Sequence, residues 1–240
     1  MFNTIRLKRP EAERFRQGEE LRFLAYVFCK RAESEAQILQ DLWVCYELGE
    51  RHGGFFAEFG ATNGLVNSNT WLLENKYGWG GFLAEPNPIW HAALAINRPS
   101  RIDHRCVSSS PGKTVSFLVT NDADPELSAI AEFADGAHFA DVRAKAEKIE
   151  VETISLNDLL SNDAAPIDID YLSIDTEGSE YDILSRLDFF ETQDLTHLGR
   201  AEPKTESDIE SLLVTQGCER VFDEHLQWDG WCRRVGSRSA

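Results

Sequence analysis

The sequence is short of positive charge. It holds 24 Lys and Arg against 41 Asp and Glu, which gives a net charge of −17 at pH 7 and a pI near 4.7. Such a surface repels phosphate backbones and anionic lipid, so neither nucleic acid nor a membrane surface is an expected partner. A neutral ligand such as a sugar is compatible with this charge. The alternative is that the charge serves only to keep the protein soluble.

The chain also lacks paired cysteines, a signal sequence and a long hydrophobic run. Its five cysteines are widely spaced and form no C-x-x-C pair, so we predict neither a metal site nor a disulfide framework. Cys29, Cys106 and Cys218 stand in apolar runs and are expected to be buried. The longest apolar stretch near the N-terminus, 21–29, is interrupted by Arg22 and is too short to span a bilayer. We therefore expect a reduced, cytoplasmic protein without an integral membrane segment.

A length of 240 residues and an apolar content of 42% suit one α/β domain with an N-terminal helical extension. Residues 19–48 show apolar positions at helical spacing, with a break at 33–35. Glycines at 49, 53 and 54 then interrupt the pattern. We predict a helical extension over residues 1–50 and the main domain over 51–240.

Short apolar strands alternate with helices through the main domain, which predicts parallel strands joined by crossover helices in a doubly wound sheet. The predicted strands are 55–59, 81–85, 102–107, 171–175 and 196–201, and the predicted helices are 67–77, 89–97, 180–187 and 206–216.

Two regions depart from that alternation. Residues 115–119 and 149–154 alternate like half-exposed antiparallel strands, and the polar stretch between them has weak helical character. We predict an insertion over the sheet at about 113–150. Residues 221–222 and 228–235 are expected to close the chain as antiparallel strands.

The first predicted strand ends in a carboxylate and a glycine turn, in the segment Phe55-Phe56-Ala57-Glu58-Phe59-Gly60-Ala61-Thr62-Asn63-Gly64. Gly60 would let the backbone approach a nucleotide-like ligand, and Gly64 would permit a left-handed turn. Thr62 replaces the second glycine of the dinucleotide fingerprint G-x-G-x-x-G, so that site is not predicted. Glu58 would suit a ligand that carries an ammonium group. The alternative is a carboxylate that caps the turn.

Two more acids end later strands. Glu85 follows the second strand, 25 positions after Gly60, where an acid can accept both ribose hydroxyls; the alternative is a solvated glutamate. Asp175 ends the strand at 171–175, and Glu177 and Glu180 begin the next helix, where the helix dipole favours acids. Acids gathered at one sheet edge repel one another unless a cation is bound. A sulfonium cofactor or a metal would supply that cation.

These segments together resemble the successive motifs of the FkbM family of methyltransferases, over about residues 55–234. The motifs are 55–64, Ser68-Asn69-Thr70, Leu83-Ala84-Glu85-Pro86-Asn87-Pro88, 154–160 and 170–181. The resemblance implies the seven-strand, Rossmann-like methyltransferase fold, S-adenosylmethionine as cofactor, and transfer to a hydroxyl. The cofactor-binding set that it implies is Glu58, Gly60, Ala61, Thr62, Asn63, Gly64, Asn69, Glu85, Pro86, Asn87 and Asp175.

The sequence departs from the family pattern at two places. Asn63 stands where the family more often has Asp, which replaces a charged contact by an amide. The end of the fifth strand reads Ala201-Glu202-Pro203, which keeps the family's acid but lacks its histidine. This second departure weakens the case for a base at that position.

The N-terminal half, including 71–74 and 106–110, is also similar to a nodulation subgroup of the family. That subgroup is associated with 2-O-methylation of a fucose on lipo-chitooligosaccharide signals. The similarity implies a glycan or glycolipid-like substrate.

A sugar hydroxyl is a poor nucleophile, so in-line attack on a methyl group benefits from a positioned base. The candidates are Asp175 and Glu177, then Glu202, then His225. His104 and His138 are weaker candidates. Trp228 and Trp231 could stack on a sugar, but packing in the core is the more common role of such residues.

Two other functions are kept as alternatives. Asp168 and Asp170 are spaced as in metal-dependent glycosyltransferases, where two carboxylates hold Mn²⁺ or Mg²⁺ against a sugar diphosphate. They precede an apolar strand, however, whereas a ligand would lie after it. The second alternative is a non-catalytic acidic binding module whose sheet edge is solvated.

Overall fold

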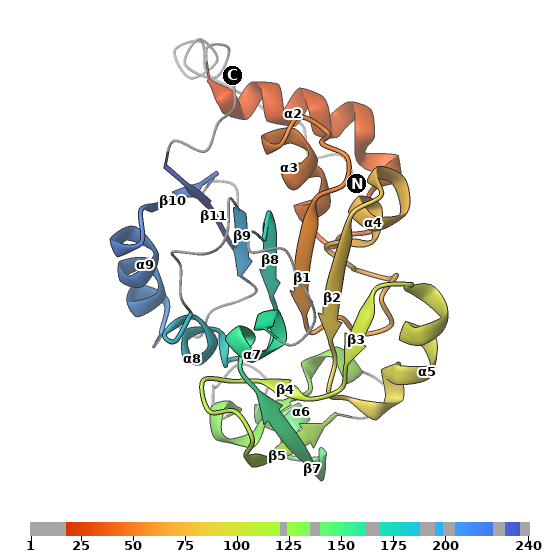
Figure 1. The fold of residues 1–240 in the computed structure, drawn as a ribbon, viewed down its shortest axis with the longest axis vertical. Coiled ribbons are helices and arrows are strands. Elements are labelled where there is room, and N and C mark those ends of the chain that lie inside the picture. The colour runs from red at the N-terminus through yellow and green to blue at the C-terminus, as the bar shows by residue number, and fades with distance from the viewer. Residues whose placement is uncertain are drawn as a thin grey trace.

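A sheet of seven strands crosses the centre of the computed structural model, which describes residues 18–120, 124–134, 140–161, 169–187, 195–198, 205–222 and 229–235 (Figure 1). The strand order is β10-β11-β9-β8-β1-β2-β3. The strands are β1 (Phe55–Phe59), β2 (Gly80–Ala84), β3 (Arg101–Asp103), β8 (Tyr171–Ile174), β9 (Leu195–Leu198), β10 (Cys218–Val221) and β11 (Gly230–Arg234). The first five run parallel to one another, β11 runs antiparallel to its neighbour β9, and β10 runs antiparallel to β11. The mixed α/β fold with a parallel sheet is confirmed.

Helices cover both faces of this sheet, as a doubly wound fold requires. The described helices are α2 (Glu19–Lys30), α3 (Gln40–Glu47), α4 (Trp71–Tyr77), α5 (Pro88–Asn97), α6 (Ala140–Arg143), α7 (Leu156–Ser161), α8 (Glu180–Leu184) and α9 (Glu206–Thr215). Three short 3-10 helices accompany them: η1 (Arg31–Glu33), η2 (Pro125–Leu127) and η3 (Ala131–Phe133).

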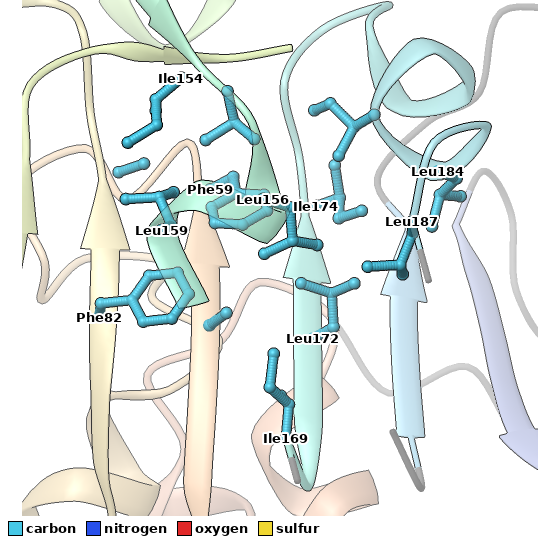
Figure 2. Packing of buried hydrophobic residues seen from close by; sticks show 14 of the residues in the cluster. Phe59, Phe82, Ile154, Leu156, Leu159, Ile169, Leu172, Ile174, Leu184 and Leu187 are labelled. Carbon is cyan, nitrogen blue, oxygen red and sulfur yellow. The ribbon is translucent and has the colours of Figure 1, made fainter. Parts of the chain in front are cut away.

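The strands divide their side chains between two cores because successive residues point to opposite faces. On one face, Leu156 and Leu159 of α7 pack against Phe59, beside α8 and α9, as Figure 2 shows for α7 and α8. On the other face, Phe56 belongs to a cluster formed with α2, α3, α4 and α5. The sheet is therefore buried on both sides, and its ligands must lie at a strand edge.

The two N-terminal helices belong to this second core. Phe23 of α2 and Trp43 of α3 are buried, and Trp43 stacks on Trp231 of β11 with ring centroids 5.1 Å apart. The helices are separated by η1 at 31–33, beside the predicted break. Cys29 is exposed, against the expectation of burial, because α2 buries Phe23 and Val27 on the opposite side. In the described part of the chain, no helix is long and apolar enough to cross a membrane.

The predicted strand 102–107 is in fact two strands in different sheets. The side chain of Asp103 accepts hydrogen bonds from the backbone N–H and the guanidinium of Arg105, which bends the chain after β3. The next strand, β4 (Cys106–Val107), pairs with β7 (Glu147–Ile154). Together with β5 (Thr114–Val119) and β6 (Ala129–Ile130) they form a sheet of order β4-β7-β5-β6. The predicted insertion thus has a sheet of its own, near the carboxyl ends of the parallel strands (Figure 1).

Candidate active site

A cavity of about 470 Å³ lies at the carboxyl edge of the parallel sheet. Phe59 is level with Ala84 of β2 and with Ile174 of β8, so these three neighbouring strands end together. The acids that the sequence places at their ends, Glu58, Glu85 and Asp175, all line this cavity. The sheet edge therefore gathers residues that are more than a hundred positions apart in the chain.

The turn after β1 depends on two glycines. Gly60 has φ of +80°, and a Cβ atom there would come within 2.0 Å of the carbonyl oxygen of Asp175. The close approach of two strand ends thus requires a glycine here, and Gly60 also lines the cavity, as its predicted contact with a ligand needs. Gly64 adopts the predicted left-handed conformation, and a Cβ there would meet Leu94 and Arg98 at 2.5 Å. Ala61, Thr62 and Asn63 line the cavity.

Glu58 is held by a buried network of the protein itself. Its carboxylate accepts hydrogen bonds from the backbone N–H of Asn69 at 2.9 Å and from the hydroxyls of Ser68 and Thr70. Arg98, whose side chain is fully buried, lies 3.4 Å from the same carboxylate and also pairs with Glu74. These bonds hold 68–70 as a loop, so α4 begins at Trp71 instead of near residue 67.

This network corrects the electrostatic argument from the sequence. The acids at the sheet edge were expected to need a bound cation, but Arg98 already balances Glu58 and Arg143 balances Glu177. Two of the four acids at this edge therefore have a cationic partner within the protein itself. The prediction that Glu58 contacts the cofactor is not tested by these bonds, and Glu58 does line the cavity.

Glu85 lies just after β2 with both oxygens fixed by the backbone. One accepts the N–H of Thr62 and the other the N–H of Asn87, each at 2.8 Å. Burial raises the pKa of Glu85 to about 7, although the two amide hydrogen bonds oppose the rise. The carboxyl group is thus held rigidly at the cavity wall, next to Pro86.

The three predicted asparagines have different environments. Asn63 accepts hydrogen bonds from the N–H groups of Leu65 and Val66 at 2.9 Å, so its amide oxygen shapes the turn as an Asp would. Asn69 lines the cavity and donates to Ser173 at 3.0 Å. Asn87 caps α5 by accepting from Ile89, and its amide reaches Ser128. Asn87 is not among the residues that line the cavity.

Asp175 and Glu177 follow β8 and face the cavity. Asp175 is exposed, whereas Glu177 has φ of +58° and accepts a 2.7 Å hydrogen bond from the buried guanidinium of Arg143. Burial raises the pKa of Glu177 to about 8; the neighbouring Asp175 adds to the rise and Arg143 opposes it. Glu180 has a structural role, because its buried carboxylate accepts the N–H groups of Thr176 and Gly178.

Several candidates lie outside the described residues: Glu202, His225, Asp168, His138 and Trp228. Of the others, His104 is exposed and stacks on His91 with ring centroids 3.6 Å apart, away from the cavity lining. Trp231 packs in the core, as its surroundings suggested. Asp170 lies at the opposite, amino edge of β8, where it binds Arg51 and the N–H of Phe55. Within the described ranges, no three His, Cys, Asp or Glu side chains gather closely enough to hold a metal ion.

Sequence reasoning missed two groups of lining residues. One is apolar and comes from α5 and the second sheet: Trp90, Val107, Phe117 and Ile130. The other is polar and comes from opposite ends of the chain, where the amide of Gln40 donates to the carboxylate of Asp229 at 2.9 Å. The sequence did offer a signal for Asp229, because the last strand was predicted to be antiparallel. A strand of that direction begins at the edge where the parallel strands end, and Asp229 directly precedes β11.

A doubly wound sheet with acids at the ends of neighbouring strands around one cavity is typical of α/β proteins that bind a nucleotide-like cofactor. The family model described as "Methyltransferase FkbM domain" matches residues 56–237. The chain therefore belongs to the FkbM family of methyltransferases. This membership implies the use of S-adenosylmethionine in general.

A comparison with solved structures finds similarity to precorrin-6y C5,15-methyltransferase from Geobacter metallireducens GS-15. The identity is 10% and the TM-score 0.41, over 80% of this chain and 84% of that chain. A comparison with curated proteins finds no match.

Proposed function

We propose that the protein transfers the methyl group of S-adenosylmethionine to a hydroxyl of a neutral sugar. The observation that carries the proposal is the convergence of Glu85, Asp175 and Glu177 on one cavity in a chain of this family. We infer an O-methyltransferase from the resemblance of the motifs and from the carboxylates available to accept a hydroxyl proton.

The wall around Glu85 suits the nucleoside part of the cofactor. The fixed carboxyl group can accept hydrogen bonds from the two ribose hydroxyls. The apolar side chains of Val107, Phe117 and Ile130 line the same cavity and suit the flat face of a purine. A volume of about 470 Å³ lies within the range of roughly 300 to 1,000 Å³ that is usual for small-molecule sites.

The end of β8 suits the reacting centre. When bound, S-adenosylmethionine supplies an electrophilic methyl group on a positively charged sulfur. The carboxylate of Asp175 favours positive charge at this point, and Asp175 and Glu177 are the described candidates for accepting the hydroxyl proton. A pKa near 8 makes Glu177 a stronger base than an ordinary carboxylate once it has lost its proton.

The acceptor is proposed more specifically from the resemblance to the nodulation subgroup, as a fucose of a lipo-chitooligosaccharide methylated at O2. The acidic composition of the chain supports a neutral glycan. The glycosyltransferase alternative is not favoured, because Asp170 is engaged at the edge of the sheet opposite the cavity.

The proposal is tested by calorimetry with S-adenosylhomocysteine and by transfer of labelled methyl groups to a glycan panel, analysed by mass spectrometry. We expect Glu85→Gln to weaken cofactor binding at least tenfold, and Asp175→Asn to reduce turnover more than cofactor affinity. Glu210→Gln is the matched control, because Glu210 is exposed on α9 and is not among the residues that line the cavity. Equal affinity in wild type and Glu85→Gln would remove the ribose assignment. Transfer that requires Mn²⁺ and a nucleotide-sugar would instead establish the glycosyltransferase.

A further inference from the structure

We propose that Gln40 and Asp229 form the acceptor subsite and bind neighbouring hydroxyls of an uncharged sugar. This inference rests on the proposed methyltransferase function. It gives a role to the side of the cavity away from the Glu85 wall, where the cofactor is proposed to bind. Both residues line the cavity, and both are buried, at 3% and 5% exposure.

The strand order places Asp229 on the far side of the reacting centre from Glu85. Asp229 directly precedes β11, whose first residue Gly230 pairs with Leu198, and Leu198 pairs with Ile174 just before Asp175. Along the sheet the order is β11, β9, β8, β1, β2, so β8 lies midway between the strands that carry Asp229 and Glu85. With strands roughly 4.8 Å apart, each lies about 10 Å from β8. A cofactor held at Glu85 and an acceptor held at Asp229 would therefore meet at the end of β8.

The N-terminal segment completes this side of the cavity. An isolated parallel bridge joins Ala36 to Asn67, and this bridge brings Gln37 and Gln40 to the cavity wall. Leu39 has φ of +72°, a conformation that is unfavourable for a residue with a side chain. The chain thus adopts a strained turn immediately before Gln40, as often occurs where a functional side chain must be placed.

The orientation of the Gln40 amide follows from its partners. Its oxygen accepts the backbone N–H of Ile38 at 3.0 Å, which only an oxygen can do, so its NH₂ group must face the carboxylate of Asp229. A carboxylate acceptor beside an amide donor matches adjacent sugar hydroxyls, each of which donates and accepts. The pair is held before any ligand arrives, because each partner fixes the other.

The charge of the cavity selects against anionic acceptors. Its lining holds one arginine, Arg105, and six acidic side chains, which are Glu58, Glu85, Glu126, Asp175, Glu177 and Asp229. Arg98 and Arg143 balance Glu58 and Glu177, and burial favours the neutral form of Glu85, so the negative charge of the cavity comes from Glu126, Asp175 and Asp229. A phosphate or carboxylate on the acceptor would be repelled there, whereas hydroxyls would be bound. The structure thus favours an uncharged glycan over a sugar phosphate.

The test uses the full chain saturated with S-adenosylhomocysteine and ligand-observed NMR of methyl α-L-fucopyranoside, methyl β-D-glucopyranoside and glucose 6-phosphate. We expect wild type to bind at least one methyl glycoside and not the phosphate. Asp229→Asn and Gln40→Met should weaken that binding at least tenfold while S-adenosylhomocysteine affinity stays within twofold. Asp208→Asn, the same chemical change at an exposed position of α9, should alter neither.

The outcomes separate this inference from the proposed function. Failure of wild type to bind S-adenosylhomocysteine would overturn the methyltransferase proposal itself. If the cofactor binds but no methyl glycoside does, or if Asp229→Asn binds it as wild type does, the acceptor assignment is wrong. A loss of cofactor affinity in the Asp229 or Gln40 variants would also overturn it, since the pair would then serve the cofactor or the fold.

Discussion

Arg98 is the residue on which the buried charges of the site depend. Its fully buried guanidinium lies between Glu58 and Glu74 and also donates to Thr70 and to the carbonyl of Gly64. Removing one partner of a buried ion pair leaves an uncompensated charge, which is far more destabilising than losing an exposed pair. Arg98 therefore stabilises the fold because its removal would leave the buried carboxylates of Glu58 and Glu74 without a positively charged partner.

We expect Arg98→Met to lower the free energy of unfolding by about 3 to 5 kcal/mol, measured by urea denaturation. Lys76→Met is the control, because Lys76 forms an exposed pair with Glu33 whose loss should change the free energy of unfolding far less. Equal effects of the two substitutions would show that Glu58 and Glu74 are solvated or protonated in the folded protein.

At the scale of the elements, the site depends on how closely β1 and β8 approach at their carboxyl ends. The backbone of Gly60 lies against the carbonyl of Asp175, and the same carbonyl precedes the loop that carries Glu177. The segment between β5 and β7 also supports that loop, because Arg143 of α6 binds Glu177 and donates to the carbonyl of Leu127 in η2. Glu177 is thus positioned jointly by the end of β8 and by Arg143 of α6.

We expect Gly60→Ala to destabilise the protein more than the left-handed backbone alone explains. Holding a residue with a side chain in the left-handed conformation costs about 1 to 3 kcal/mol. The clash between the added Cβ atom and the carbonyl oxygen of Asp175 increases that cost. Gly217→Ala is the matched control, since Gly217 has nearly the same φ, +77°, with no atom within 4 Å of an added Cβ. Thermal unfolding of both variants measures the difference, and equal shifts in Tm would show that the two strand ends separate easily.

At the scale of the whole molecule, buried acids oppose stability at high pH. Burial raises the pKa of Asp41 to about 6, of Glu85 to about 7 and of Glu177 to about 8, against ordinary values near 4. In that window the folded state binds more protons than the unfolded state. The stability that these groups provide is complete at low pH and is lost as the pH rises through their folded pKa values.

We therefore expect Tm to fall between about pH 4.5 and pH 8, the range between the ordinary and the raised pKa values, and repulsion within a chain of net charge −17 should act in the same direction. The double variant Glu85→Gln, Glu177→Gln should show a smaller fall, because two of the groups no longer titrate. Calorimetric scans at constant ionic strength measure both proteins. A Tm that rises over this range would contradict the raised pKa values.

Local patterns were sufficient to predict most strands and the residues at their ends. The strand at 55–59 and the left-handed Gly64 follow from apolar runs and glycine placement, which act over a few residues. The end of the strand predicted at 102–107 was wrong, because the bend at Asp103 and Arg105 arises from a side-chain interaction that periodicity does not report. The burial of Cys29 was wrong for a related reason: the sequence does not show which side of α2 meets the sheet.

The sequence by itself determined that acids stand at the carboxyl ends of parallel strands, since parallel pairing brings such ends to one edge. Only the tertiary structure decided how those acids are balanced, because Arg98 and Arg143 come from distant elements. It alone also brought Gln40 to Asp229, a pair separated by 189 residues. Packing of the N-terminal helices on the sheet creates that contact, and no local pattern encodes it.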